Sequence, residues 1–238
     1  MEKFSGQDMR ITAIIPARGG SKGVLRKNVA LVAGRPLISW TIEEALKCDK
    51  IDKVVVNTDD LEIAEIAKAY GAETQMRPSE LAQDSSSVFG ALNYGLDRFK
   101  EQGHKSTHTL QLNPTSPLRT VTHINESIQL LEDFKADSVV SVTQAHTHPY
   151  WCKVVSDDFQ LNDFLDQGPD DYKIRQELPE VYALNGSIFL VKNELIRANS
   201  YYGGKTVPYI MTSDCSIDID TPWELYLANL VLTDRKNL

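Results

Sequence analysis

Short apolar runs alternate with amphipathic stretches along most of the chain. Residues 10–16 form the first apolar run, rich in β-branched side chains, and a glycine-rich stretch follows it, as expected where a buried strand enters a loop. Residues 36–46 place Ile38, Ile42 and Leu46 on one face and carry a proline suited to a first helical turn, which predicts an amphipathic helix. The same periodicities predict further strands at 53–57, 107–112, 138–142 and 182–191, and helices at 61–70, 88–102 and 123–134.

This alternation indicates the fold class. Strands and helices in repeated β-α-β order imply an α/β fold, with a mostly parallel sheet covered by helices on both faces. Ligands of such sheets bind beyond the carboxyl ends of the strands. From about residue 145 to 180 the order breaks into polar, aromatic and proline-containing sequence. We interpret this stretch as a small arm outside the main sheet, and its free strand edges predict a partner subunit that covers them.

Composition and charge exclude several classes of protein. With 42% hydrophobic and 24% charged residues over 238 positions, the chain is expected to form one globular domain over 10–238, after a loose tail over 1–9. A net charge of −8 gives no global attraction for nucleic acid. No apolar run resembles a membrane span or a signal peptide, so we expect no membrane partner. The three cysteines are widely spaced, which fits a reducing cytoplasm rather than a disulfide or zinc framework.

The stretch after the first strand, residues 17–28, concentrates positive charge in an acidic chain. Its glycines permit close approach of the backbone to a ligand, and its four cations would neutralise a polyphosphate. The spacing is neither that of a P-loop nor that of a dinucleotide-binding turn. The alternative is a basic turn exposed to solvent. The cations are Arg18, Lys22, Arg26 and Lys27, and the glycines are Gly19, Gly20 and Gly23.

A second candidate site lies near the end of the chain, at residues 216–224. In an extended segment alternate side chains share a face, so Asp218 and Asp220 would project together while the neighbouring isoleucines pack inward. Two convergent carboxylates suit Mg²⁺, which binds one or two carboxylates together with substrate phosphates. Thr221 and Glu224 form a capping-box pattern with a proline at the first helical position, so a helix is expected to begin here. The alternative is that either aspartate belongs only to that cap.

Two further loops hold polar groups near predicted elements. Arg77 and the serines at 85–87 precede a predicted helix, whose N-terminus favours anionic or polar ligand groups. Residues 111–119 follow a predicted strand as a polar, proline-stiffened loop at the ligand-binding edge. Taken singly, the first pattern is also typical of a helix cap and the second of a rigid turn. His146 and His148 have no further ligand at metal spacing, so we expect a solvated loop there.

Together these segments resemble the acylneuraminate cytidylyltransferases, the CMP-sialic acid synthetase family, over residues 11–232. Each motif is ambiguous alone, but their ordered occurrence at compatible spacing is specific. The resemblance implies a Rossmann-like domain and a homodimer whose arm reaches towards the partner's sugar site. It also implies CTP, Mg²⁺, and attack by the anomeric hydroxyl of a nine-carbon 2-keto sugar acid on the α-phosphorus of CTP, with release of pyrophosphate. The motifs lie at residues 17–28, 77–84, 114–119, 185–186 and 216–221.

The resemblance also implies residue roles. Lys27 would stabilise charge on the α-phosphate, while Asp218 and Asp220 would bind the metal, one of them also helping to deprotonate the sugar hydroxyl. A guanidinium at Arg175 suits the carboxylate of the sugar acid. The triphosphate loop then comprises Ala17, Arg18, Gly19, Ser21, Lys22 and Lys27, the cytidine side comprises Asn28, Arg77, Ser85, Ser86 and Ser87, and the sugar side comprises Gln111, Asn113, Trp151, Arg175 and Asn185.

Two departures from the family pattern concern the sugar. Enzymes that use N-acetylneuraminate are expected to carry a basic residue shortly after the His-Pro of the arm and an arginine two places before Asn-Gly, whereas Trp151 and Ala183 stand there. An aromatic, less cationic lining suits a deoxygenated diacetamido sugar such as legionaminate, because apolar groups leave no polar partner unsatisfied. The alternatives are another sugar nucleotidyltransferase of the same fold, such as one for 3-deoxy-manno-octulosonate, and a non-catalytic nucleotide-binding module. The motifs at 77–84 and 218–221 argue against the first, and the retained charges argue against the second.

Overall fold

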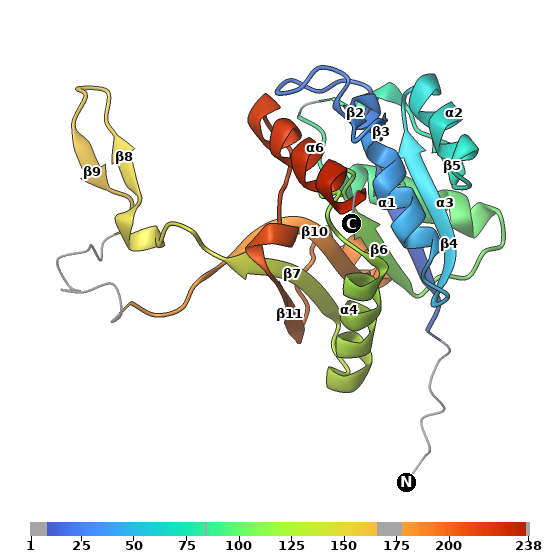
Figure 1. The fold of residues 1–238 in the computed structure, drawn as a ribbon. Helices are drawn as coiled ribbons and strands as arrows, with labels where there is room; N and C mark the ends of the chain where they lie inside the picture. Colours follow the sequence, from blue (N-terminus) through green and yellow to red (C-terminus); the bar gives the residue numbers. More distant parts are fainter. Residues whose placement is uncertain (1–8, 84, 166–177, 237–238) are drawn as a thin grey trace, which may run out of the picture.

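The computed structural model describes residues 9–83, 85–165 and 178–236, and a seven-stranded sheet runs through its centre (Figure 1). The order of the strands is β11-β7-β10-β6-β1-β4-β5, and every neighbouring pair is parallel except the two that β10 makes. The expected mostly parallel sheet is therefore confirmed. The strands are β1 (Ile11–Pro16), β4 (Ile51–Thr58), β5 (Glu73–Met76), β6 (His108–Leu112), β7 (Ser138–Gln144), β10 (Tyr182–Lys192) and β11 (Thr206–Met211).

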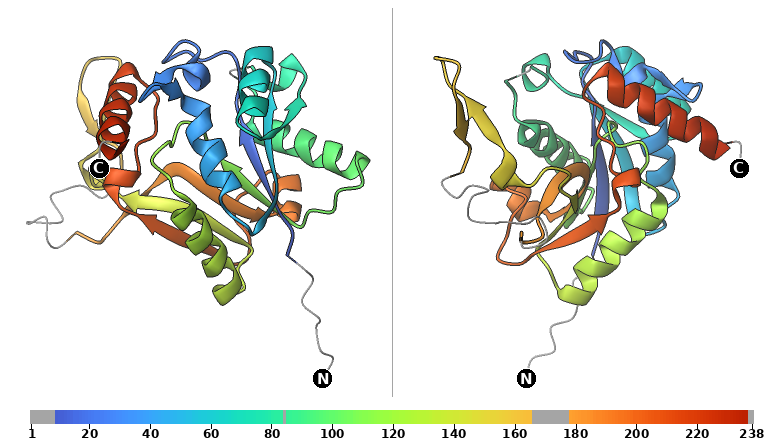
Figure 2. Two further views of the ribbon diagram at one scale, coloured as in Figure 1. Left: turned by 45° about the vertical axis from the view of Figure 1, so that its right-hand side comes forward. Right: turned by 60° about the vertical axis from the view of Figure 1, so that its left-hand side comes forward.

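Helices cover both faces of this sheet, as the sequence predicts (Figure 2). On one face, α1 (Leu37–Leu46), α2 (Leu61–Ala69) and α4 (Val121–Phe134) bury their apolar sides against β1, β4 and β6 in one core cluster. On the other face, α3 (Val88–Glu101) and the short α5 (Asn193–Arg197) form a second cluster with the sheet. The helices therefore fix the sheet from both sides and leave the loops at its carboxyl edge to form a site.

A smaller cluster lies beside the main sheet. There α6 (Pro222–Lys236) packs on the hairpin of β2 (Leu31–Val32) and β3 (Arg35–Pro36). Because Pro36 pairs with Leu31 in that hairpin, its backbone is extended, and it caps α1 rather than entering the first helical turn as we expected. Within the described part of the chain, no helix is both long and apolar enough to cross a membrane.

The predicted arm holds a second hairpin. The 3-10 turn η3 (Pro149–Trp151) leads into β8 (Lys153–Val155), which pairs with β9 (Leu161–Asp163), and Figure 1 shows this hairpin standing away from the sheet. All residues of both strands are exposed, and Phe159 at the tip is 91% exposed. Such an apolar surface on a two-stranded hairpin is unstable in water by itself. That a second copy covers it stays a prediction.

Candidate active site

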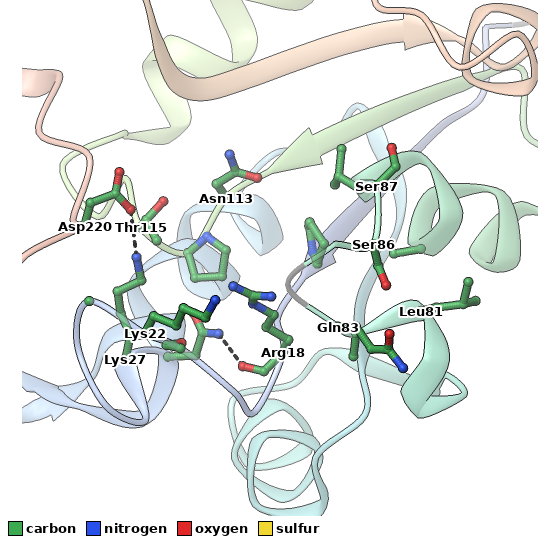
Figure 3. A pocket seen from close by; sticks show the side chains of 18 of the residues that line it. Arg18, Lys22, Lys27, Leu81, Gln83, Ser86, Ser87, Asn113, Thr115 and Asp220 are labelled. Atoms are coloured by element: carbon green, nitrogen blue, oxygen red, sulfur yellow. Dashed lines mark hydrogen bonds and ion pairs between the residues drawn. The ribbon is translucent and has the colours of Figure 1, made fainter. Parts of the chain in front are cut away.

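A cavity of about 470 Å³ opens beyond the carboxyl ends of β1, β5 and β6 (Figure 3). Parallel strands bring the loops that follow them to the same edge, so segments far apart in sequence meet there. Most of the predicted nucleotide-binding and metal-binding residues line this one cavity. Its polar lining comprises Arg18, Ser21, Lys22, Lys27, Asn28, Arg77, Gln83, Ser86, Ser87, Asn113, Thr115, Asp218 and Asp220.

The cationic loop closes directly onto the acidic segment. Nζ of Lys27 lies 3.0 Å from Oδ1 of Asp220 and also donates to the carbonyl oxygen of Ile219. A Cβ atom added to Gly23 would overlap the carbonyl oxygen of Asp220, so only glycine allows this approach. Behind the loop, Nδ2 of the buried Asn28 donates to the carbonyl oxygen of Arg18 at 2.9 Å and holds the turn in shape.

One of the four cations serves the loop rather than the cavity. Arg26 has left-handed backbone (φ 54°), and its guanidinium pairs with the carboxylates of Asp60 and Glu62. Asp60 also caps α2, because its Oδ1 accepts from the N–H of Ile63 at 3.0 Å. Asp59 accepts from the N–H of Gly19 at 3.1 Å. The loop is therefore fastened to the start of α2 at two points.

The two aspartates lie in different environments. Asp218 is held over the cavity because its neighbour Ile219 is fully buried and donates its N–H to the carbonyl oxygen of Thr115 at 2.9 Å. Burial raises the pKa of Asp218, a side-chain hydrogen bond with Thr115 opposes this rise, and the negative charge of Asp220 adds to it. Asp220 is exposed, and its carboxylate pairs with Lys27. The segment thus adopts the predicted alternation, with Ile219 fully buried, Ile217 partly buried against the same cluster, and both aspartates at the cavity.

The donor set fits a hard divalent cation that shares its ligands with a phosphate. Oδ1 of Asp218 is buried and accepts no hydrogen bond within the described part of the chain, so a carboxylate oxygen is left for another partner. Among the described residues, no group of three or more His, Cys, Asp or Glu side chains is arranged to hold a metal ion. Two carboxylates without a third protein ligand suit Mg²⁺, which keeps waters and substrate phosphates in its remaining positions.

Arg77, predicted on the cytidine side, forms part of the cavity wall. Its guanidinium is buried, donates to Oδ1 of Asn57 at 3.1 Å and lies 4.0 Å from Oδ1 of Asp59. Burial lowers the pKa of Arg77, because few groups there compensate its charge. A buried guanidinium of this kind can hold a polar ligand group in one orientation.

The three serines before α3 have separate environments. Ser87 caps α3, accepting from the N–H of Phe89 at 3.2 Å, and it also lines the cavity. Ser86 lines the cavity as well, and its hydroxyl donates to the carbonyl oxygen of Glu80 at 2.7 Å. Ser85 is exposed and is not part of the described lining. The cap interpretation is therefore confirmed for Ser87, and a binding role for these serines stays a prediction.

The residues predicted on the sugar side are spread over three places. Asn113 lines the cavity, and Gln111, 3% exposed, donates from Nε2 to Oδ1 of Asn113 at 2.9 Å. Asn185 is buried in the fold and bonds to the hydroxyls of Ser141 and Ser216. Trp151 lies on the arm, outside the cavity of this subunit. Arg175 is outside the described residues. Their contact with a sugar acid stays a prediction.

Two residues of the 114–119 motif shape the site, although the sequence assigns neither of them a role of its own. Arg119 is 2% exposed and donates to the hydroxyl of Thr41 and to the carbonyl oxygen of Ser187, both at 2.7 Å. Complete burial lowers the pKa of Arg119 to about 9. It fastens the 113–119 loop to α1 and β10, so the rigid-turn interpretation holds for this arginine. Thr115, in the same loop, lines the cavity.

The fold and this cavity define a nucleotide-handling α/β protein, with cations and carboxylates facing one another at the carboxyl edge of the sheet. Comparison with known proteins gives the family. The chain belongs to the cytidylyltransferase family, whose family model matches residues 12–227.

Curated relatives include proteins of the type that the sequence motifs indicate. The chain is 36% identical over 230 residues to an N-acylneuraminate cytidylyltransferase of Escherichia coli. This alignment covers 96% of this chain and 53% of that protein. It is 37% identical over 222 residues to a CMP-N,N'-diacetyllegionaminic acid synthase of Legionella pneumophila. This alignment covers 91% of this chain and 94% of that protein. The chain thus spans about half the length of the first relative and nearly all of the second. The resemblance seen in the motifs is confirmed.

Solved structures share the fold at low sequence identity. A CMP:2-keto-3-deoxy-manno-octonic acid synthetase complexed with CTP superposes with a TM-score of 0.71 at 16% identity, covering 95% of this chain and 99% of that one. A 4-diphosphocytidyl-2C-methyl-D-erythritol synthase of Anaerococcus prevotii gives a TM-score of 0.65 at 19% identity, with the same coverage. The expected Rossmann-like architecture is therefore confirmed.

Proposed function

We propose that this chain transfers CMP from CTP to the anomeric hydroxyl of a nine-carbon 2-keto sugar acid and releases pyrophosphate. The observation that carries this proposal is the single cavity in which the cationic loop faces Asp218 and Asp220. Membership of the cytidylyltransferase family and the names of the relatives support the choice of CTP and of a sialic-acid-like acceptor.

The reaction needs positioning and charge neutralisation more than covalent catalysis. A bond forms between the anomeric oxygen and the α-phosphorus, while the bond from that phosphorus to the bridging oxygen breaks and pyrophosphate leaves with the electron pair. Arg18 and Lys22 would bind the triphosphate from their side of the cavity (Figure 3), and Lys27 would contact the α-phosphate. The proton of the attacking hydroxyl would pass to one of the two carboxylates, Asp218 or Asp220, which both line the cavity.

The metal that this chemistry implies would be held by Asp218 and Asp220. When bound, Mg²⁺ neutralises and orients the phosphate oxygens. Lys27 pairs with Asp220 in the structure. This ion pair would have to open for Asp220 to hold the metal and for the ammonium group of Lys27 to contact phosphate. The proposal includes cytoplasmic location and no nucleic-acid partner, consistent with the acidic chain.

The proposed enzyme is a homodimer whose arm takes part in the partner's sugar site. The exposed apolar residues of the β8-β9 hairpin support this, because an apolar surface of this kind is covered in most soluble proteins. Light scattering after size exclusion would give twice the chain mass. A monomer at micromolar concentration would contradict the dimer and leave the CTP site unaffected.

We propose a diacetamido sugar of the legionaminate type as the acceptor. Trp151 and Ala183 stand where a cation is expected in enzymes for N-acetylneuraminate, and the Legionella relative is named for the diacetamido sugar. The experiment is pyrophosphate release with CTP and Mg²⁺ across N-acetylneuraminate, legionaminate, pseudaminate, and 3-deoxy-nonulosonate and 3-deoxy-octulosonate derivatives. A preference for legionaminate supports the proposal. An equal kcat/KM for N-acetylneuraminate removes the sugar assignment, and silence with every acid removes the reaction.

A further inference from the structure

A chain of side-chain hydrogen bonds runs from an aromatic cluster to the cavity. The hydroxyl of Tyr201 donates to Oε1 of Gln111 at 2.6 Å, and Nε2 of Gln111 donates to Oδ1 of Asn113 at 2.9 Å. Asn113 alone of the three lines the cavity, and Figure 3 shows it across from Lys22 and Arg18. Tyr201 therefore reaches the site only through its neighbours.

The aromatic cluster fixes Tyr201 in place. Its ring lies between those of Phe89 and Phe189, with centroid distances of 4.6 Å and 4.4 Å. Burial raises the pKa of Tyr201 to about 12, so the phenol keeps its proton at neutral pH. Among the described residues, Gln111 is the hydrogen-bond partner of this hydroxyl. The phenol proton is donated to the amide oxygen of Gln111. If the amide NH₂ group faced the phenol instead, the phenol proton would have no acceptor.

This donation sets the orientation of both amides. If Gln111 presents its amide oxygen to Tyr201, its NH₂ group faces Asn113. The side-chain oxygen of Asn113 then accepts the hydrogen bond from that NH₂ group. Nδ2 of Asn113 is then turned the other way. A Cβ atom built on Gly186 would lie 3.7 Å from this nitrogen and 2.7 Å from Oδ2 of Asp218, so the amide N–H groups and the carboxylate border the same small space.

We infer that Tyr201 is a positioning residue for the sugar acid, one whose hydroxyl makes Asn113 present N–H donors to an acceptor oxygen of the sugar beside Asp218. The inference rests on the proposed function and adds a residue to it. Without the hydroxyl, the Gln111 amide can turn over and Asn113 can follow. The cavity would then present an amide oxygen next to a carboxylate, and an acceptor oxygen of the sugar would be repelled.

The test is Tyr201→Phe, which keeps both ring contacts and removes only the hydroxyl. We expect KM for the sugar acid to rise about tenfold, while KM for CTP stays within about twofold of the wild-type value, since one oriented hydrogen bond to the sugar is lost. The matched control is Tyr209→Phe. It removes another tyrosine hydroxyl bond, to Glu126 on α4, from a residue that is 8% exposed and not part of the cavity lining.

A double-mutant cycle separates positioning from a general packing effect. If Tyr201 acts through Asn113, Tyr201→Phe should change KM for the sugar by less than about twofold in an Asn113→Ala background. A full tenfold change there, or an unchanged KM in the single variant of an active enzyme, would overturn the inference and leave the proposed function standing. A wild-type chain that releases no pyrophosphate with any sugar acid overturns the proposed function, and this inference falls with it.

Discussion

Gly23→Ala tests whether the contact between the cationic loop and the acidic segment sets the rate. The Cβ of alanine would overlap the carbonyl oxygen of Asp220, whereas real Cβ atoms stay at least 3.0 Å from such an atom. Both groups belong to the backbone or lie directly on it, so neither can swing aside. The backbones at Gly23 and Asp220 must therefore separate by about 1 Å. Lys27 and Asp218 then move apart by a similar amount. A misplacement of about 1 Å in a reacting geometry lowers a rate by about 10²-fold.

The control for this variant is Gly20→Ala, because a Cβ atom at that position meets nothing within 4 Å. Each substitution replaces a glycine by alanine, so both lower the conformational entropy of the unfolded chain by the same amount. Pyrophosphate release under saturating CTP and sugar acid should fall about 10²-fold for Gly23→Ala and less than about threefold for Gly20→Ala. Equal turnover in the two variants would refute the idea that this close approach aligns the site.

Further predictions concern the charged groups. Lys27→Ala and Asp220→Asn should each lower kcat by about 10²-fold or more in the pyrophosphate assay. Both should melt close to wild type, and near-normal turnover in either purified variant would contradict its role. EDTA should stop turnover and added Mg²⁺ restore it; activity that survives chelation would contradict the metal assignment. Asp218→Asn should lose turnover yet melt higher at neutral pH. The pKa of Asp218 is raised in the folded protein, so ionising this carboxyl group destabilises the fold. The destabilisation is absent below the unfolded pKa of about 3.9 and grows as the pH rises through the folded pKa. An equal gain in melting temperature at pH 3 would contradict this prediction.

The sequence predicts the parts of the fold that have strong periodicity, and misses those that depend on position in the sheet. β11 contains Pro208, which speaks against a strand, but β11 is the edge of the sheet and an edge strand tolerates a missing N–H. β5 is short, polar and at the other edge, so its alternation carries little apolar signal. By contrast, the predicted helix at 88–102 and the predicted strand at 107–112 agree with α3 and β6 to within one residue at each end.

For the site, residue type and spacing locate the chemistry but do not say which polar group is already occupied. Arg26 looks equivalent to Lys27 in the sequence, and only the fold shows that it pairs with Asp60 and Glu62. Asn185 is part of a motif, yet its amide is buried and bonded within the fold. Tyr201 carries no local signal at all, because its link to the cavity runs through a residue 90 positions away.

Stability and function are divided between adjacent residues of the acidic segment. Ile219 is fully buried and anchors the segment in the cluster below α6, whereas Asp218 on its other side keeps a buried oxygen without a hydrogen bond. A buried carboxylate oxygen without a hydrogen bond is costly, and it persists because the surrounding packing fixes the backbone. Gly186 with its positive φ leaves the carboxylate just enough room. The free protein therefore holds Asp218 in a state that a cation or an incoming hydroxyl would stabilise, so binding there recovers energy that the fold alone does not supply.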